Sequence, residues 1–205
     1  AIYSIENYLT SRRLMYWSVY LHKTVVAYEK TLINTLRRAE YLAKQGWDIF
    51  ASPALKYFLY NDIDARWFEE HPETLDWYSQ LDDNDIWSAL KVWAHSKDMI
   101  LSMLATDVIN RHIFKVEVRE APVEGDELET IRKSIAEKAG IDEVDVGYFM
   151  SVSTVQKDMY DINDDHISIL YKDGVIKDIA DASELLNVDL LSKKIRKYYL
   201  CYQRF

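Results

Sequence analysis

Residues 12–23 read RRLMYWSVYLHK, and this stretch decides how the N-terminal part of the chain folds. It lies inside a segment from Ser4 to Gln45 that contains neither proline nor glycine, and its apolar residues recur at helical spacing. A helix of that length would extend about 60 Å at about 1.5 Å per residue, which is long for a globular protein. We therefore predict one long helix that ends at Gly46.

Four residues of this stretch, Arg12, Tyr16, Tyr20 and Lys23, fall within roughly 80° of one another at about 100° per residue. They form one stripe along the helix. A phosphorylated ligand suits such a stripe, because Arg offers a bidentate fork, Lys a point charge and Tyr a donor beside a flat apolar wall. The same spacing is also typical of a solvated face with half-buried tyrosines, and geometry alone leaves both interpretations open.

Helical signals continue to about residue 112. Ser52-Pro53 has the pattern of an N-cap followed by proline at the first helical position, and His71-Pro72 precedes another short helix. The acidic run at 82–85 supplies N-cap candidates for helical periodicity that extends to Ile109. We favour this capping role over a cation site, because the spacing of the run does not match an EF-hand loop.

The pattern changes after Arg111 from helical periodicity to strand-like alternation. Strands are predicted at 113–119, 146–155, 166–171, 175–179 and 196–202, with helices at 126–139 and after Ser183. Asp173-Gly174 is a strong hairpin-turn signal. We therefore predict an α+β fold, in which an all-helical part with one long helix (1–112) precedes a small ferredoxin-like α+β lobe with an antiparallel-rich sheet (113–205).

Composition narrows the classes of function. The net charge of -9 over 205 residues argues against generic nucleic-acid binding and against binding to anionic membranes. No apolar run is long enough to span a bilayer, and Cys201 is the only cysteine, so we expect a soluble, cytoplasmic protein. The 15 Tyr and 6 Trp favour a homo-oligomer, because aromatic side chains serve interfaces as well as cores.

The chemistry of a metal-dependent hydrolase needs clustered His and carboxylate ligands, which this sequence does not show. It contains no HExxH motif, His-Asp dipeptide, P-loop or nucleophile elbow, and its histidines occur singly at His22, His71, His95, His112 and His166. The sequence therefore predicts no metal site within this chain. The loop at Asp164-Asp165-His166 is interpreted as a lead into a strand.

Residues 2–9 (IYSIENYL) followed by 12–23 resemble the post-catalytic helix of bacterial HD-superfamily phosphohydrolases, which are related to deoxynucleoside triphosphate triphosphohydrolases. Further matches follow in order at 81–87, 110–115 and 165–169. In that family a His, a His-Asp pair and a further Asp hold a divalent metal upstream of this helix, and this sequence contains none of that set. The resemblance implies the C-terminal portion of such an enzyme, inactive by itself. The start at Ala1 rather than Met, close to a helix, fits that expectation.

The resemblance also implies roles for the stripe. It implies that Arg12 holds the substrate triphosphate and neutralises its charge, and that Tyr20 packs beside the deoxyribose. Tyr16 stands where the mammalian relative has a histidine, and a phenol is a poor general base at neutral pH. The implied reaction is hydrolysis of a deoxynucleoside triphosphate to deoxynucleoside and triphosphate.

The resemblance also implies that five further basic residues match positions that are regulatory in the mammalian relative. His22 and Lys23 match positions that contact a regulatory nucleotide between subunits, and Arg111, Lys115 and Lys172 match other contributors to such a site. From the residues alone, a lysine at a hairpin tip is typical of a solubilising surface position. The alternative function is a non-catalytic oligomerisation or nucleotide-sensing module, which the aromatic content favours.

Overall fold

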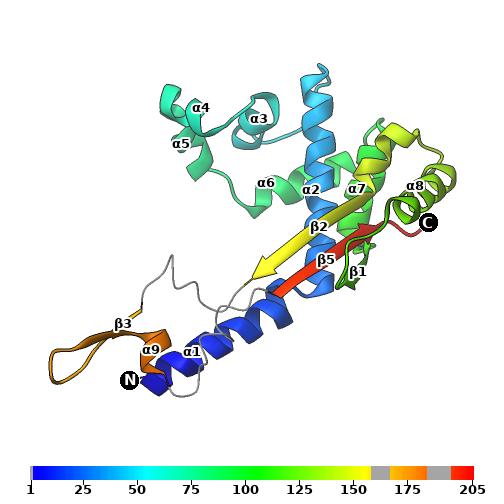
Figure 1. Cartoon of the computed structure of the whole chain (residues 1–205). Helices are drawn as coiled ribbons and strands as arrows, with labels where there is room; N and C mark the ends of the chain where they lie inside the picture. Colours follow the sequence, from blue (N-terminus) through cyan, green and yellow to red (C-terminus); the bar gives the residue numbers. More distant parts are fainter. Residues whose placement is uncertain (1, 158–166, 184–194) are drawn as a thin grey trace. The chain divides into compact units, whose positions relative to one another are not determined.

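The computed structural model describes residues 2–157, 167–183 and 195–205 (Figure 1). These residues pack into two compact units, each built from separate stretches of the chain. Unit 1 comprises Ala1–Val26, Val116–Gly125 and Val152–Leu200, and unit 2 comprises Ala27–Lys115, Asp126–Ser151 and Cys201–Phe205. The boundary near residue 112 marks the change from helices to strands, and as a domain boundary it stays a prediction.

The predicted long helix is interrupted. Helix α1 covers Ile2–Met15, a π-helix follows at Tyr16–Tyr20, and α2 covers Lys23–Lys44. Leu21 leaves the helical region with φ -100° and ψ 11°, and its N–H donates to the Tyr16 carbonyl at 2.8 Å, the wider spacing of a π turn. The expectation of one continuous helix from Ser4 to Gln45 is therefore wrong.

Local chemistry explains the interruption. The π segment is rich in aromatic and β-branched residues, which have weak helix propensity. The Ser18 hydroxyl donates to the Leu14 carbonyl, a side-chain bond that competes with the backbone ladder and bends helices. The His22 side chain then supports a new start, because its Nδ1 accepts a hydrogen bond from the Thr24 N–H at 3.3 Å.

Helices of unit 2 begin where the sequence places caps. The Ser52 hydroxyl accepts from the Leu55 N–H at 3.3 Å, and Asp82 forms a reciprocal capping box with Asp85. Hydrogen bonds from Asn84 lower the pKa of Asp82, so the capping role predicted for this acidic run is confirmed. The helices are α3 (Pro53–Tyr60), α4 (Ala65–Glu70), α5 (Glu73–Ser79), α6 (Asp83–Trp93) and α7 (Met99–Asn110). Only α4, which Asp64 caps, was not predicted.

The core of unit 2 joins α2 to three later helices, and Figure 1 shows α2 among α3, α6 and α7. Its buried residues include Ala39, Leu42, Leu55, Leu59, Leu90, Trp93, Leu101 and Val108. The Trp93 indole N–H donates to the Phe50 carbonyl at 2.9 Å, which satisfies the polar group of a side chain that is 2% exposed. The apolar periodicity from α2 to α7 thus corresponds to one core within unit 2.

A buried ion cluster also ties unit 2 together. The Arg38 guanidinium donates to Asp98 at 2.7 and 3.1 Å and to Asp145 at 2.9 Å. Burial alone would lower the pKa of Arg38, but the hydrogen bonds to Asp98 and the charges of both carboxylates raise it above its ordinary value. Asp98 also caps α7 through the Leu101 N–H at 2.8 Å. This cluster therefore holds α2, the start of α7 and the 3-10 turn at Glu143–Tyr148 in register.

The strands form two sheets. Strands β1 (Lys115–Arg119), β5 (Ile195–Tyr202) and β2 (Met150–Lys157) make a sheet in the order β1-β5-β2, and Figure 1 shows β2 and β5 running in opposite directions. Strands β3 (Ser168–Leu170) and β4 (Ile176–Asp178) pair antiparallel around Gly174, whose φ is 85°. Helix α8 (Gly125–Ala139), a 3-10 turn (Glu143–Tyr148) and α9 (Ile179–Ala182) complete the described elements.

The α+β class and the hairpin are confirmed. Within the described residues, however, the hairpin is a separate two-stranded sheet instead of extending a ferredoxin-like one. In unit 1, α9 explains this, because Ile179 and Ala180 bury against Leu9 of α1 and carry the hairpin with them. The helix predicted after Ser183 and the loop at 164–166 lie outside the described residues, apart from Ser183 itself. No helix in the described ranges has the length and apolarity needed to cross a membrane.

Candidate functional site

The three residues predicted to bind substrate line one pocket in unit 1. This pocket, which we call the α1 pocket, is an open hollow of about 510 Å³ lined by Tyr8, Ser11, Arg12, Met15, Tyr16 and Tyr20. All six side chains come from α1 and the π-helix. The sequence did not single out Tyr8 or Ser11, although they lie one turn before Arg12 and Met15 on the same helix.

Inside the α1 pocket a cation lies beside an aromatic wall. The Arg12 Cζ atom is 5.7 Å from the Tyr16 ring centroid, and the Tyr16 and Tyr20 centroids are 5.3 Å apart at an interplanar angle of 50°. Tyr20 is 51% exposed, and Arg12 is also exposed. No carboxylate lines the pocket, and Arg12 has no ion pair with any described residue. An anion with a flat body could therefore bind Arg12 and stack on the phenols.

The π-helix that shapes this pocket is braced by β5. The Lys197 ammonium lies 4.7 Å from the Trp17 ring centroid. The buried Tyr199 hydroxyl donates at 3.1 Å to the Leu21 carbonyl, which lies where the helical ladder is broken. Sequence reasoning missed both contacts, because they join residues about 180 positions apart, and no local pattern indicates such a pair.

The stripe predicted from the sequence is divided. His22 lies at the break before α2 and Lys23 is the first residue of α2, and both side chains are exposed. Neither lines the α1 pocket. The π turn and the turn at Leu21 change the helical phase that the stripe assumed, so the tyrosines share a pocket with Arg12 and Lys23 does not.

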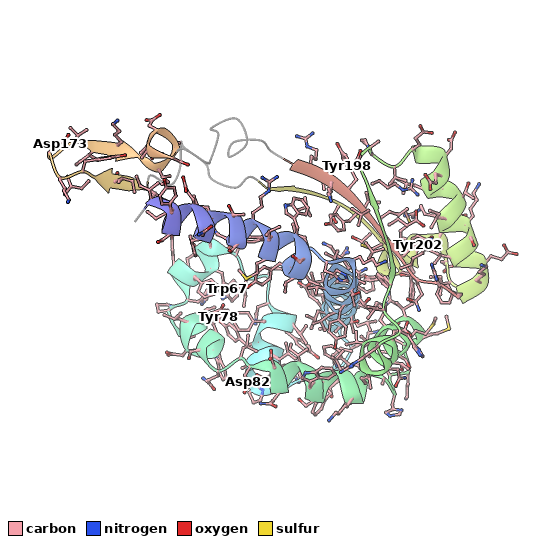
Figure 2. All side chains as sticks on the ribbon, turned by 90° about the horizontal axis from the view of Figure 1, so that it is seen from below. Trp67, Tyr78, Asp82, Asp173, Tyr198 and Tyr202 are labelled. Carbon is pink, nitrogen blue, oxygen red and sulfur yellow. The ribbon has the colours of Figure 1, made fainter. Side chains whose placement is uncertain are left out.

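The other predicted regulatory residues occur in both units. In unit 2, Arg111 ends α7 in the left-handed conformation with φ 59° and ψ 31°, and the Lys115 Nζ donates to the Tyr202 hydroxyl at 2.7 Å. In unit 1, the exposed Lys172 belongs to the hairpin turn, next to Asp173 (Figure 2). No described contact joins these residues into one site, and their regulatory role stays a prediction.

One carboxyl group has a strongly perturbed pKa. Burial raises the pKa of Asp107 to about 6, while the nearby His112 lowers it in part. The Gln203 Nε2 donates to this carboxylate at 2.8 Å. Asp107 lies in unit 2 and does not line the α1 pocket.

The residues that the structure describes contain no cluster of three or more His, Cys, Asp or Glu side chains that could hold a metal ion. The described part of the chain thus offers a binding pocket with a cation and phenols, but it does not fit a metal centre. A guanidinium beside two phenols has the chemistry to bind and orient a phosphorylated group.

The known proteins that are similar to this chain include a phosphohydrolase. The chain has a TM-score of 0.91 and 57% identity with the crystal structure of a phosphohydrolase from Bacteroides thetaiotaomicron VPI-5482, covering 99% of this chain and 50% of that one. It is 29% identical over 208 residues to the uncharacterized protein YwfO of Bacillus subtilis (strain 168), covering 98% of this chain and 45% of that protein. No family model matches the sequence. The chain thus spans about half the length of both relatives.

Proposed function

We propose that this chain supplies the phosphate- and sugar-binding part of a metal-dependent phosphohydrolase of the HD superfamily. The reaction of the whole protein is hydrolysis of a deoxynucleoside triphosphate to deoxynucleoside and triphosphate. The observation that carries the proposal is the α1 pocket, which brings Arg12, Tyr16 and Tyr20 together on a chain similar to a phosphohydrolase.

Each residue of the pocket has a separate task in this proposal. Arg12 binds the triphosphate and stabilises the charge that builds up on its oxygens during bond cleavage. Tyr20 packs against the deoxyribose, and Tyr16 orders the guanidinium through its ring face, 5.7 Å from Cζ. Because no carboxylate lines the pocket, the phosphate meets no fixed negative charge there.

The divalent metal belongs to the whole protein in this proposal. The described residues do not supply its ligands, so the metal would be held by residues outside this part of the chain. The 205-residue chain alone is therefore expected to bind triphosphate without hydrolysing it.

The test is hydrolysis by the longer protein that contains this chain, followed as release of deoxynucleoside and triphosphate. Arg12→Ala should lower kcat/KM by about 100-fold or more, because a charge contact made to the reacting phosphates is lost. Arg66→Ala is the matched control, since Arg66 is an arginine whose side chain is 80% exposed on α4 in unit 2. Equal activity of Arg12→Ala and wild type would remove Arg12 from the site. Release of inorganic phosphate in place of triphosphate would show that the enzyme catalyses a different hydrolysis.

A second candidate is an oligomerisation or nucleotide-sensing module without catalysis. Large apolar side chains on and beside the π-helix favour it, since Leu14, Met15 and Val19 are 61%, 43% and 51% exposed. In this reading His22, Lys23, Arg111, Lys115 and Lys172 bind a regulatory nucleotide between subunits. Sedimentation of the chain with and without deoxynucleoside triphosphates tests it, and a monomer under both conditions would contradict it. Lys23→Ala should weaken nucleotide-dependent assembly.

A further inference from the structure

A second pocket lies wholly in unit 2, between one face of α8 and the residues that follow β5. It encloses about 420 Å³, and Figure 2 shows Tyr202 beside α8 at this place. From α8 it receives residues four apart, among them Ser134 and Lys138, which share a helix face. We call it the α8 pocket.

The charge of the α8 pocket differs from that of the whole chain. Lys138 and Arg204 line it and no Asp or Glu does, although the chain has a net charge of -9. Both side chains are exposed, and neither has an ion pair with any residue that the structure describes. Two cations without carboxylate partners beside one hollow favour an anion that carries two charges.

The rest of the lining is partly hydroxylic and partly apolar. Thr130, Ser134 and Tyr202 contribute hydroxyl groups, and that of Thr130 already donates to the Asp126 carbonyl at 2.9 Å, which leaves two for a ligand. Ile135, which is 3% exposed, forms an apolar floor. Phe205 adds an aromatic ring, 43% exposed, that packs edge-on against Phe149 with centroids 5.7 Å apart. A ligand that fills this pocket would therefore combine an anionic head with an apolar or aromatic body.

The wall opposite α8 is fixed in place. The Gln203 backbone N–H donates to the Phe149 carbonyl at 2.9 Å, and its side-chain Nε2 donates to Asp107 at 2.8 Å. The Lys115 ammonium donates to the Tyr202 hydroxyl at 2.7 Å and lies 5.1 Å from the centroid of its ring. Lys115 therefore orients a hydroxyl of the pocket.

We infer that the α8 pocket binds a phosphate monoester with an apolar or aromatic body, a site separate from the α1 pocket. A phosphate monoester carries close to two negative charges at neutral pH and three acceptor oxygens, which match two cations and two hydroxyls. A carboxylate offers one charge and two oxygens. Inorganic phosphate offers the charge without a group for the apolar floor.

Phenyl phosphate is the probe, titrated into the 205-residue chain carrying Arg12→Ala so that the α1 pocket does not contribute. We expect saturable binding with a Kd on the order of 0.1 to 1 mM, about tenfold tighter than benzoate or inorganic phosphate. Backbone amide shifts at Ser134 and Tyr202 should saturate with the same constant. No saturation up to about 10 mM, or equal binding of benzoate, would overturn the inference.

Charge variants locate the site. Lys138→Ala and Arg204→Ala should each weaken phenyl phosphate binding by about tenfold, because each removes one charge-assisted contact. Lys133→Ala is the matched control, since Lys133 is an exposed lysine of the same helix that does not line the pocket. An equal loss with Lys133→Ala would show diffuse charge attraction and would contradict a built site. These outcomes do not depend on hydrolysis, so they stand apart from the proposed function.

The role of Lys115 as a positioning residue has its own test. Tyr202→Phe removes only the hydroxyl and should weaken binding about threefold, with Lys115→Met giving a similar loss. If Lys115 acts through that hydroxyl, the double variant should bind no more weakly than Tyr202→Phe alone. Full additivity would show that Lys115 acts on the ligand or the fold by another route.

Discussion

Two arginines of this chain show what separates a structural cation from a candidate binding cation. Arg38 is 8% exposed and its guanidinium donates to two carboxylates, Asp98 and Asp145. Arg12 is exposed, lies over the ring of Tyr16 and has no carboxylate partner among the described residues. Arg38 is therefore neutralised by carboxylates of the protein itself, while Arg12 is accessible to a ligand.

This difference follows from physical necessity. A guanidinium without water must be compensated by carboxylates, and those carboxylates leave no positive field for an outside anion. A guanidinium that is exposed to water is solvated, so it can remain without a protein partner at little cost in free energy. The contrast between a compensated and an uncompensated arginine can be tested by mutation.

Removal of a carboxylate from the Arg38 cluster should have the largest effect on stability. Asp98→Ala leaves Arg38 with one partner and removes the cap of α7, so the free energy of unfolding should fall by about 3 to 5 kcal/mol. Urea unfolding followed by circular dichroism measures it. The control is Asp62→Ala, whose carboxylate is 86% exposed beside Lys44 and should contribute less than about 1 kcal/mol. An equal loss of unfolding free energy in Asp98→Ala and Asp62→Ala would show that the buried cluster contributes no more than an exposed ion pair.

Truncation of the exposed arginine should leave the fold intact. Arg12→Ala is expected to change the free energy of unfolding by less than about 0.5 kcal/mol, because no described ion pair is broken. The same variant should weaken the affinity of the chain for tripolyphosphate by about tenfold, measured by calorimetry. A large loss of stability would show that Arg12 serves the fold in the manner of Arg38.

Asp107 is a buried carboxyl group that no arginine or lysine among the described residues compensates as Arg38 compensates Asp98, and it should make stability depend on pH. The pKa of Asp107 is raised to about 6, so between about pH 4 and pH 6 the unfolded chain loses this proton before the folded chain does. Stability should therefore fall as pH rises through that window, by about 1 to 2 kcal/mol after allowance for solvent screening. Asp107→Asn should remove this contribution, seen as the difference between the two stability curves. Parallel curves would contradict it.

The last prediction concerns the single cysteine, and its expected effect is on reactivity instead of stability or affinity. Cys201 is 0% exposed, and burial raises the pKa of its thiol to about 11. We expect reaction with a disulfide reagent at pH 8 to be at least about 100-fold slower in the folded chain than in urea. Because the chain has one cysteine, the reagent reports on this position alone. A rapid reaction in the folded state would show that this end of β5 opens readily.

Local sequence predicted much of the fold. The caps at Ser52 and Asp82 and the turn at Gly174 were predicted because each depends on a few adjacent residues. The π-helix was missed, because the sequence from Ser4 to Gln45 contains no proline or glycine that would announce it. The separate hairpin was missed for a different reason, since its placement depends on burial of Ile179 against Leu9.

For the site, the sequence by itself determined the chemistry, since Arg12, Tyr16 and Tyr20 supply a cation and two phenols at helical spacing. Only the tertiary structure decided that these three share a pocket while Lys23 lies outside it, and that Lys115 meets Tyr202 beside a second pocket. The physical reason is the separation along the chain over which each interaction acts. Helical spacing and capping act over a few residues, whereas the π turn is braced and the α8 pocket is closed by contacts between residues far apart in the chain.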